Sequence, residues 1–317
     1  MDIWQIRAFG QRPEAVAAPD PEPRAGAVRL QFRAASLNHR DLMVADGRYD
    51  PGATLPIVPL SDAVWTVLDG PAAGSRAVTA FAPGHPSGDP SRQVVRGALG
   101  CRTPGVAASL SLALPDDLVS VPDAIDDATA ATLPCAALTA WSALHVGGPP
   151  RPGDRVLTWG TGGVACWTAA LGKAMELNVT VATSDPARGR ILEGLGATAI
   201  PRDDAVGRAG PFDRVVDVAG GRALASALPA VRNGGHIALV GVLDGHQSPL
   251  DLLPIVMRTL HLHGIFVGSR QGLKDLVAFV AANGCRVPVT LFPWSSLPEA
   301  YDALARGGTI GKIVVTR

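Results

Sequence analysis

The 317-residue chain has few of the features that mark several classes of protein. Its basic and acidic side chains balance to a formal net charge of zero, so no surface for nucleic acid or an acidic membrane is expected. No apolar run reaches membrane-spanning length. The start, Met1-Asp-Ile-Trp-Gln-Ile, has neither the basic nor the apolar region of a secretion signal. We therefore expect a cytoplasmic protein without nucleic-acid or membrane partners.

Cysteine is also scarce. The four cysteines are scattered, with no C-x-x-C pair and no metal-ligand spacing: Cys101, Cys135, Cys166 and Cys285. A disulfide framework is therefore not expected, which agrees with a reducing compartment. The length suffices to bury a large core and to form two domains.

A glycine-rich segment is the most informative feature that is present. The apolar stretch 155–159 runs directly into glycines, and a helical pattern follows to Met175. A phosphate-cradling loop requires this strand–turn–helix context. Gly160 would form the tight turn, Gly162 would let the backbone approach a pyrophosphate, and the helix start would attract its charge. We predict that a dinucleotide binds at Gly160, Thr161, Gly162, Gly163 and Val164.

The end of the next strand, 178–183, is the expected position of the adenosine ribose. An acidic residue here accepts hydrogen bonds from the ribose hydroxyls, whereas serine and arginine suit a 2′-phosphate. Asp185 represents the first kind, and Ser184 and Arg188 the second. We favour NADPH over NADH, with Thr183, Ser184 and Arg188 at the site. The alternative is that Arg188 is only a solvated charge on a helix.

Two patterns divide the chain. Up to about Pro122, short alternating strands punctuated by proline and glycine indicate a small β-barrel. The pattern is helical over 124–145. From 152 onward, strands alternate with helices, which predicts a parallel sheet wrapped by helices. The strands expected there are 155–159, 179–183, 213–218, 235–240 and 260–267, and the helices are 163–176, 186–195, 221–232 and 271–283.

Several motifs occur in a distinctive order. They include Ser36-Leu-Asn38-His39-Arg-Asp41, Leu55-Pro-Ile-Val-Pro-Leu-Ser61-Asp62, Ala131-Thr-Leu-Pro-Cys135-Ala-Ala-Leu-Thr139, Gly160-Thr-Gly-Gly-Val, Leu195-Gly-Ala197 and Gly311-Lys312-Ile-Val-Val. Over nearly its whole length the chain resembles the medium-chain dehydrogenase/reductase superfamily, and within it the zinc-free quinone oxidoreductase and enoyl reductase branch.

The resemblance implies an α/β fold with two domains. A GroES-like β-barrel catalytic domain is expected at 1–121, with 269–317 returning to it. A Rossmann domain, a doubly wound parallel sheet, is expected at 122–268. NAD(P)H would bind in the cleft between the two.

Zinc-dependent members of this superfamily hold a catalytic metal with Cys, His and Cys at fixed motif positions. By the resemblance these positions fall on Asn38, Ser61 and Cys135. One thiolate is too few for catalytic zinc, which takes three protein ligands, so no metal is expected.

Without a Lewis acid, a conjugated acceptor is favoured. Hydride then adds to a carbon while charge spreads to a remote carbonyl oxygen, which one or two hydrogen-bond donors can stabilise. The expected function is zinc-independent, NADPH-dependent reduction of a small-molecule quinone, enone or enoyl thioester.

Three residues are candidates for the chemistry. The resemblance places Asn38 at the nicotinamide end of the cleft, where its amide can donate to substrate or cofactor. His39 has an ordinary pKa near 6.5, which suits a general acid, unless it is packed beneath the barrel. Tyr49 resembles a tyrosine that contacts the cofactor near the nicotinamide, and simple loop packing is the alternative.

Further cofactor contacts are implied beyond the carboxyl ends of the strands. Thr139 lies on the helix that enters the Rossmann domain, and Lys312 is expected to reach the cofactor from the barrel side. The other candidates are Ala219, Gly241, Val242, Leu243, Phe266 and Val267.

Trp65 departs from the family pattern, because relatives have a glycine there. A bulky indole in the barrel motivates an alternative function: a redox-silent relative that uses the cleft for cyclisation, isomerisation or addition in a biosynthetic pathway. A non-catalytic nucleotide-binding protein is a third possibility.

The last expected strand of the parallel sheet, 260–267, carries Leu260, Leu262, Ile265 and Val267. An exposed apolar edge strand promotes aggregation unless something covers it. In a two-fold symmetric dimer the same strand of each subunit can pair with its mate. We expect a homodimer joined through this strand.

Overall fold

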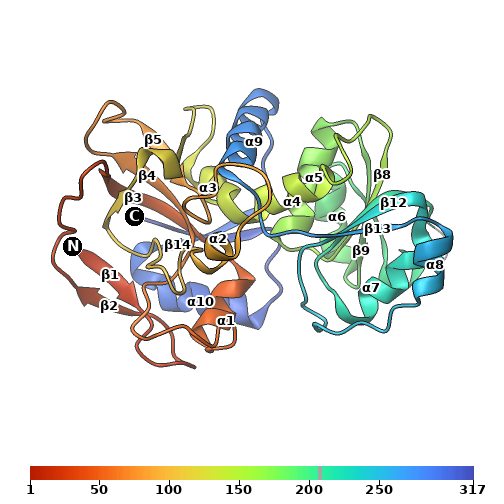
Figure 1. Cartoon of the computed structure of the whole chain (residues 1–317), viewed down its shortest axis with the longest axis horizontal. Coiled ribbons are helices and arrows are strands. Elements are labelled where there is room, and N and C mark those ends of the chain that lie inside the picture. The colour runs from red at the N-terminus through yellow and green to blue at the C-terminus, as the bar shows by residue number, and fades with distance from the viewer. Residues whose placement is uncertain (206–208) are drawn as a thin grey trace. The chain divides into compact units, whose positions relative to one another are not determined.

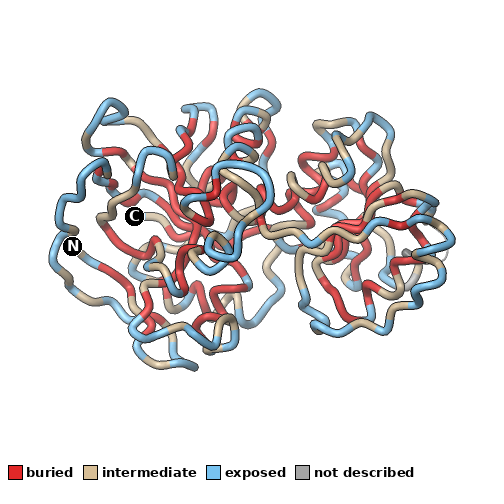
Figure 2. Tube along the Cα trace, in the orientation of Figure 1, coloured by how far each residue is buried: buried red, intermediate tan, exposed pale blue. Residues whose placement is uncertain are grey.

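The computed structural model describes residues 1–205 and 209–317 and divides the chain into two compact units. The first unit comprises 1–138, 268–284 and 289–317, and the second comprises 139–267 and 285–288. In each unit, buried segments run through the interior and exposed segments lie at the periphery (Figure 2). Within the described residues, no helix has both the length and the apolar character needed to cross a membrane.

The first unit contains a mainly antiparallel sheet in the order β14-β15-β3-β4-β5-β7, with β6 paired to the start of β3. Figure 1 labels β3, β4, β5 and β14 of this sheet. In β3, Val28, Leu30 and Phe32 are buried while their neighbours face solvent, as the period of two predicts. The strands are β1 (Asp2–Gln5), β2 (Glu14–Ala17), β3 (Val28–Leu37), β4 (Asp62–Val67), β5 (Arg76–Thr79), β6 (Leu110–Ala113), β7 (Leu118–Ser120), β14 (Val289–Pro293) and β15 (Lys312–Thr316). The predicted barrel-type domain is confirmed.

Helical segments complete this unit. They are α1 (His39–Ala45), α2 (Arg92–Arg96), η1 (Pro115–Asp117), α3 (Asp127–Ala131), the π-helical η2 (Leu133–Ala137), α9 (Arg270–Asn283), η5 (Trp294–Ser296) and α10 (Leu297–Arg306). Trp65 is fully buried in the core, where its indole meets Phe32 edge-on with ring centroids 5.8 Å apart. Phe32 in turn lies 4.3 Å from the ring of Trp294. The indole that replaces the family's glycine is therefore a core packing residue.

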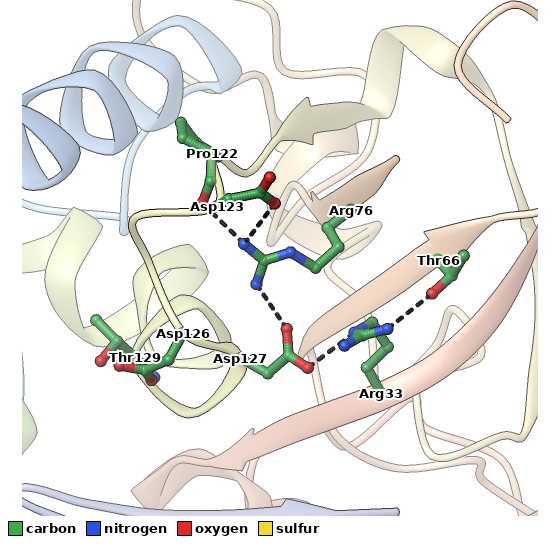
Figure 3. Close-up of polar contacts among 8 residues, drawn as sticks. All are labelled: Arg33, Thr66, Arg76, Pro122, Asp123, Asp126, Asp127 and Thr129. Carbon is green, nitrogen blue, oxygen red and sulfur yellow. Dashed lines mark hydrogen bonds and ion pairs between the residues drawn. The ribbon is translucent and has the colours of Figure 1, made fainter. Parts of the chain in front are cut away.

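Helix α3 is anchored to the barrel by one carboxylate (Figure 3). Asp127 accepts 2.8 Å hydrogen bonds from Arg33 on β3 and from Arg76 on β5. Arg76 also donates to the carbonyl of Pro122 at 2.8 Å. The expected domain boundary at 121/122 precedes these contacts, whereas the compact first unit continues to residue 138. The helical pattern alone could not reveal which unit α3 packs against.

The second unit contains a parallel sheet in the order β10-β9-β8-β11-β12-β13. This is the strand order of a dinucleotide-binding Rossmann sheet, which confirms the predicted fold. The strands are β8 (Arg155–Trp159), β9 (Asn178–Thr183), β10 (Thr198–Pro201), β11 (Phe212–Asp217), β12 (Val231–Leu239) and β13 (His261–Gly264). The helical segments are α4 (Leu138–Leu144), which begins at the unit boundary, α5 (Gly163–Ala174), α6 (Pro186–Gly194), η3 (Arg202–Ala205), α7 (Gly221–Ala227), η4 (Leu228–Ala230) and α8 (Leu252–Met257).

Four details of the second unit differ from expectation. Strand β10 and helix α8 were not predicted, and the helix expected over 221–232 is wrong at its end, where β12 already begins at Val231. The last strand is shorter than 260–267. Pro229 explains the early end of α7, because proline interrupts a helix and 3₁₀ geometry replaces it there.

Candidate active site

The turn between β8 and α5 has the geometry of a phosphate cradle. Gly160 has φ +79°, which favours glycine, so it forms the tight turn as predicted. Gly162 has an ordinary φ of −80°, and a Cβ added there would meet no atom within 4 Å. No side chain caps the start of α5, so its first backbone N–H groups face this open space. Neither backbone strain nor a protein neighbour demands glycine at 162, so the small residue leaves open space beside the backbone. The turn therefore fits a dinucleotide pyrophosphate.

The loops after β11 and β12 lie against each other at the same carboxyl edge of the sheet. The carboxylate of Asp217 accepts from the backbone N–H of Ala219 at 3.0 Å. A Cβ on Gly241 would lie 2.6 Å from the carbonyl oxygen of Val218, so this glycine allows the close approach. The neighbouring Val242 and Leu243 are exposed. The structure thus brings Ala219 and Gly241–Leu243 together beside the sheet edge.

The position predicted for the ribose follows β9. Asp185 caps α6 by accepting from the backbone N–H of Ala187 and Arg188, and its second oxygen pairs with the Arg188 guanidinium at 3.0 Å. Thr183 is buried and accepts from the backbone N–H of Asp185, while Ser184 is exposed. The carboxylate that suits a ribose hydroxyl is therefore already engaged.

The remaining cofactor candidates of the second unit differ in exposure. Thr139 is buried on α4, and Val267 is buried with φ +50° just beyond β13. Phe266 is half-buried.

A group that we term the polar cluster, Asn38, Ser61, Asp62 and Lys312, lies buried in the first unit. The Asp62 carboxylate accepts from Asn38 Nδ2 at 2.9 Å and from Ser61 Oγ at 2.6 Å. Lys312 Nζ donates to Asn38 Oδ1 at 2.5 Å and to the carbonyl of Leu37. The amide of Asn38 therefore joins a carboxylate on one side to an ammonium on the other.

Two further charged residues adjoin the polar cluster. Asp41 Oδ2 accepts from the backbone N–H of Asn38 at 2.7 Å, which fixes the start of α1. Burial raises the pKa of Asp41 to about 6, against the pull of Arg40. Arg40 donates to the carbonyl of Leu99 and lies over the ring of Tyr49, 4.5 Å from its centroid.

The polar cluster also perturbs the thiol of Cys135. Burial raises the pKa of Cys135 well above its usual range, and the negative charge of Asp62 raises it further. Lys312 acts in the opposite direction on that thiol. The pKa of Lys312 itself is lowered by burial, although Asp62 opposes the change. Asn38 and Ser61 are thus hydrogen-bonded to the Asp62 carboxylate, and the Cys135 thiol responds to the charges of both Asp62 and Lys312.

The other two catalytic candidates lie at the surface of this region. His39 is exposed rather than packed beneath the barrel, and partial burial and Arg48 lower its pKa. A lowered pKa leaves the imidazole neutral at pH 7, which weakens it as a proton donor. Tyr49 is half-buried against the barrel core and under Arg40, so its ring is held in place.

The residues at the metal-ligand positions do not fit a catalytic zinc ion. Catalytic zinc takes three nitrogen, sulfur or carboxylate donors, with cysteine bound as the thiolate. Here an amide and a hydroxyl replace two of them, both are bonded to Asp62, and the thiol strongly resists ionisation. Across 1–205 and 209–317, no group of three or more His, Cys, Asp or Glu side chains is placed to hold a metal.

Comparisons with known proteins identify the relatives of this chain. Residues 163–282 match the family described as zinc-binding dehydrogenase. A zinc-type alcohol dehydrogenase-like protein of Schizosaccharomyces pombe is 30% identical, with 98% of this chain and 96% of that protein covered. The chain belongs to the medium-chain dehydrogenase/reductase superfamily.

Solved structures agree with this membership. A candidate alcohol dehydrogenase of Sinorhizobium meliloti has a TM-score of 0.91 and 31% identity, covering 100% of this chain and 98% of the other. An NAD-dependent alcohol dehydrogenase has a TM-score of 0.89 and 25% identity, with both chains covered completely. This member of the superfamily is an oxidoreductase of the alcohol-dehydrogenase type.

Sequence reasoning found Asn38 and Lys312 but missed their partners. Asp62 and Asp41 stood within the quoted motifs, yet neither was assigned to the site. Asp62 follows the mostly apolar stretch 55–60, and a charge in such a place predicts a buried group that needs a partner. Asp41 follows the polar residues 38–40 and gave no such signal. The expectation that Lys312 reaches the cofactor remains untested, since its ammonium turns toward Asn38.

Proposed function

We propose that the protein is a zinc-independent, NADPH-dependent reductase of conjugated carbonyl compounds: quinones, enones or enoyl thioesters. The observation that carries this proposal is the polar cluster at the metal-ligand positions. It offers hydrogen-bond donors from Asn38 and Lys312 and lacks the donor set of a zinc site. Donors suffice for a conjugated acceptor, because its developing charge is delocalised onto an oxygen remote from the reacting carbon.

NADPH, when bound, supplies the hydride. The Gly160–Val164 turn would hold the pyrophosphate against the start of α5. Thr139, Ala219, Gly241–Leu243 and Phe266–Val267 would surround the nicotinamide end. Asn38, His39 and Tyr49 stay predictions for contacts with substrate or nicotinamide.

The preference for NADPH rests on the partners of Asp185. That carboxylate is occupied by two backbone N–H groups and by Arg188, so it is poorly placed to accept from a ribose hydroxyl. Arg188 is partly exposed and can exchange one carboxylate partner for a 2′-phosphate, beside the exposed Ser184.

The redox-silent alternative is not part of the proposal, because the observation that suggested it has another explanation. It depended on an indole at position 65 that would reshape the substrate pocket, and Trp65 lies in the core of the barrel.

A homodimer is part of the proposal. Strand β13 is an edge strand of the sheet in the described part of the chain. Nearby, α8 exposes Leu252, Leu253, Val256 and Met257, each at least 65% accessible. Contiguous apolar surface of this kind marks an interface, and a second copy would cover both features symmetrically.

The direct test uses protein dialysed against EDTA, with its metal content measured. NADPH oxidation is followed with 2-cyclohexenone, 1,4-benzoquinone and crotonyl-CoA, and with cyclohexanone as the saturated control. We expect turnover with at least one conjugated acceptor, little with cyclohexanone and no gain on adding zinc. Turnover of the saturated ketone alone, or a strict need for zinc, would contradict the proposal.

A further inference from the structure

The ammonium of Lys312 has a hydrogen-bonding capacity that the structure does not use. A lysine ammonium carries three N–H donors. Two of them are taken by Leu37 O and Asn38 Oδ1. Among the described residues, no acceptor is hydrogen-bonded to the third. The residue is only 5% exposed, so water cannot freely satisfy that donor.

Asn38 has a second unused donor beside it. Its amide oxygen faces Lys312 and one amide hydrogen is given to Asp62, so both neighbours fix the orientation of the amide group. An amide nitrogen carries two hydrogens. The other Nδ2–H has no partner in the described part of the chain. Two unused donors are thus associated with one amide group: the Lys312 ammonium at its oxygen and the second N–H of its own nitrogen.

This arrangement is costly for stability. Removing an ammonium and a carboxylate from water costs several kcal/mol per ion, and apolar residues of similar volume often replace such a pair without loss. Lys312 and Asp62 are both buried, and the chain has only two other lysines, Lys173 and Lys274. A buried charge with an unused donor indicates a site for an oxygen atom.

We propose that Lys312 is a catalytic residue: with Asn38 it forms a two-donor hole for the carbonyl oxygen of the substrate, taking the electrostatic place of the metal ion of zinc-dependent relatives. The assignment rests on the proposed function. As hydride reaches the conjugated carbon, electron density moves through the double bond to the carbonyl oxygen. The Lys312 and Asn38 N–H groups stabilise the resulting enolate oxygen, and a proton from water then converts the enolate to the saturated product. Asp62 is a positioning residue: it holds the Asn38 amide, and its negative charge favours the protonated form of Lys312.

The experiment compares Lys312→Met, which keeps the length and removes the charge, with Lys312→Arg. Lys274→Met on α9 is the matched control at an exposed lysine. Loss of one such donor lowers kcat about 100-fold or more. We expect that loss in Lys312→Met, with the Kd of NADPH within about threefold and the Lys274→Met variant unchanged. An equal kcat in Lys312→Met and wild type would overturn the assignment.

The pH profile separates a catalytic charge from a structural one. Burial lowers the pKa of Lys312, against Asp62, Cys135 and Asp41, so wild-type kcat should fall on the alkaline side as the ammonium deprotonates. Arginine stays charged throughout. Lys312→Arg should therefore retain measurable activity, and its kcat should fall only at a higher pH than that of wild type or not fall at all. An alkaline limb identical in both proteins would overturn the proposal, even if Lys312→Met does not fold.

A binding measurement keeps the two proposals distinct. Benzoate, a stable carboxylate that mimics the charged oxygen, is titrated by calorimetry into wild type, Lys312→Arg, Lys312→Met and Lys274→Met. We expect Lys312→Met to bind at least tenfold more weakly than the others. If wild type fails to oxidise NADPH but shows this Lys312 dependence, the reductase function fails while the oxygen site stands. Absence of Lys312-dependent binding would overturn the oxygen site.

Discussion

At the scale of single residues, burial determines the chemistry of the polar cluster. Asp41 is completely buried, and its Oδ1 has no hydrogen-bond partner among the described residues. Its Oδ2 holds the backbone N–H of Asn38 and thereby the residue that offers a donor. Burial favours the protonated carboxyl over the carboxylate. Because this group accepts from the backbone N–H of Asn38, the positioning of Asn38 is linked to pH.

We predict that Asp41→Asn changes the pH dependence of stability. The folded pKa of about 6 exceeds the ordinary 3.8, so the native state binds this proton more tightly than the unfolded state. The stability that Asp41 contributes is therefore present below about pH 4 and is lost as pH rises through 6, a difference of about 3 kcal/mol. Asparagine keeps the acceptor for Asn38 and cannot ionise.

The check is the free energy of urea unfolding between pH 4 and 8. We expect the Asp41→Asn variant to lose about 3 kcal/mol less than wild type across this range. Asp89→Asn, at an exposed loop position, should run parallel to wild type. If the curve for Asp41→Asn also runs parallel to wild type, folding does not raise the pKa of Asp41.

The proposed preference for NADPH depends, at the same scale, on Arg188. Arg188→Ala removes a charge-assisted contact with the 2′-phosphate, so NADPH should bind about 1.5–3 kcal/mol more weakly and NADH almost unchanged. Fluorescence titration of both cofactors measures this, with Arg190→Ala on the exposed side of α6 as control. Equal weakening of both cofactors, or of neither, would make Arg188 a surface charge only.

At the scale of elements, the sequence pattern predicted most strands of the parallel sheet. Strands β8, β9, β11 and β12 follow from short apolar segments that alternate with helical ones, and the β8–α5 turn follows from its glycines. Strand β10 was missed because it has four residues and ends in a proline. Helix α8 was missed because its six residues are all apolar or proline, so the segment has no polar face and no helical period.

The β8–α5 turn provides the element-scale prediction. Gly162→Val places a branched side chain in open space that we assign to the pyrophosphate, and the backbone there is extended, so the fold should tolerate it. NADPH affinity should fall at least tenfold, about 1.4 kcal/mol. Gly194→Val on α6, also with nothing near its Cβ, is the matched control. Wild-type affinity in Gly162→Val would remove the turn from the cofactor site.

At the scale of the whole molecule, sequence reasoning reached the superfamily and both folds but not the interior of the polar cluster. Lys312 and Asn38 are 274 positions apart, and no local pattern reveals that their side chains meet. The resemblance singled out both residues, yet it could not show that they are hydrogen-bonded to each other or that Asp62 connects Asn38 to Ser61. Such long-range polar contacts depend on how the completed barrel closes.

Assembly is the whole-molecule prediction. If α8 and β13 form the contact between two copies, Val256→Glu should place a charge in that interface and dissociate the dimer. Ile191→Glu, at another exposed apolar residue, should leave the mass unchanged. Light scattering at micromolar concentration measures both. A monomeric wild type would contradict the homodimer.

The central claim is hydride transfer to a conjugated carbon without zinc. The most direct measurement supplies NADPH deuterated on each face of C4 in turn, with 2-cyclohexenone and metal-depleted protein, and locates the deuterium by NMR. The account predicts deuterium at C3 of cyclohexanone, from one of the two faces only, in protein free of zinc. Deuterium at C1 of an alcohol product, or transfer only after zinc is restored, would contradict it.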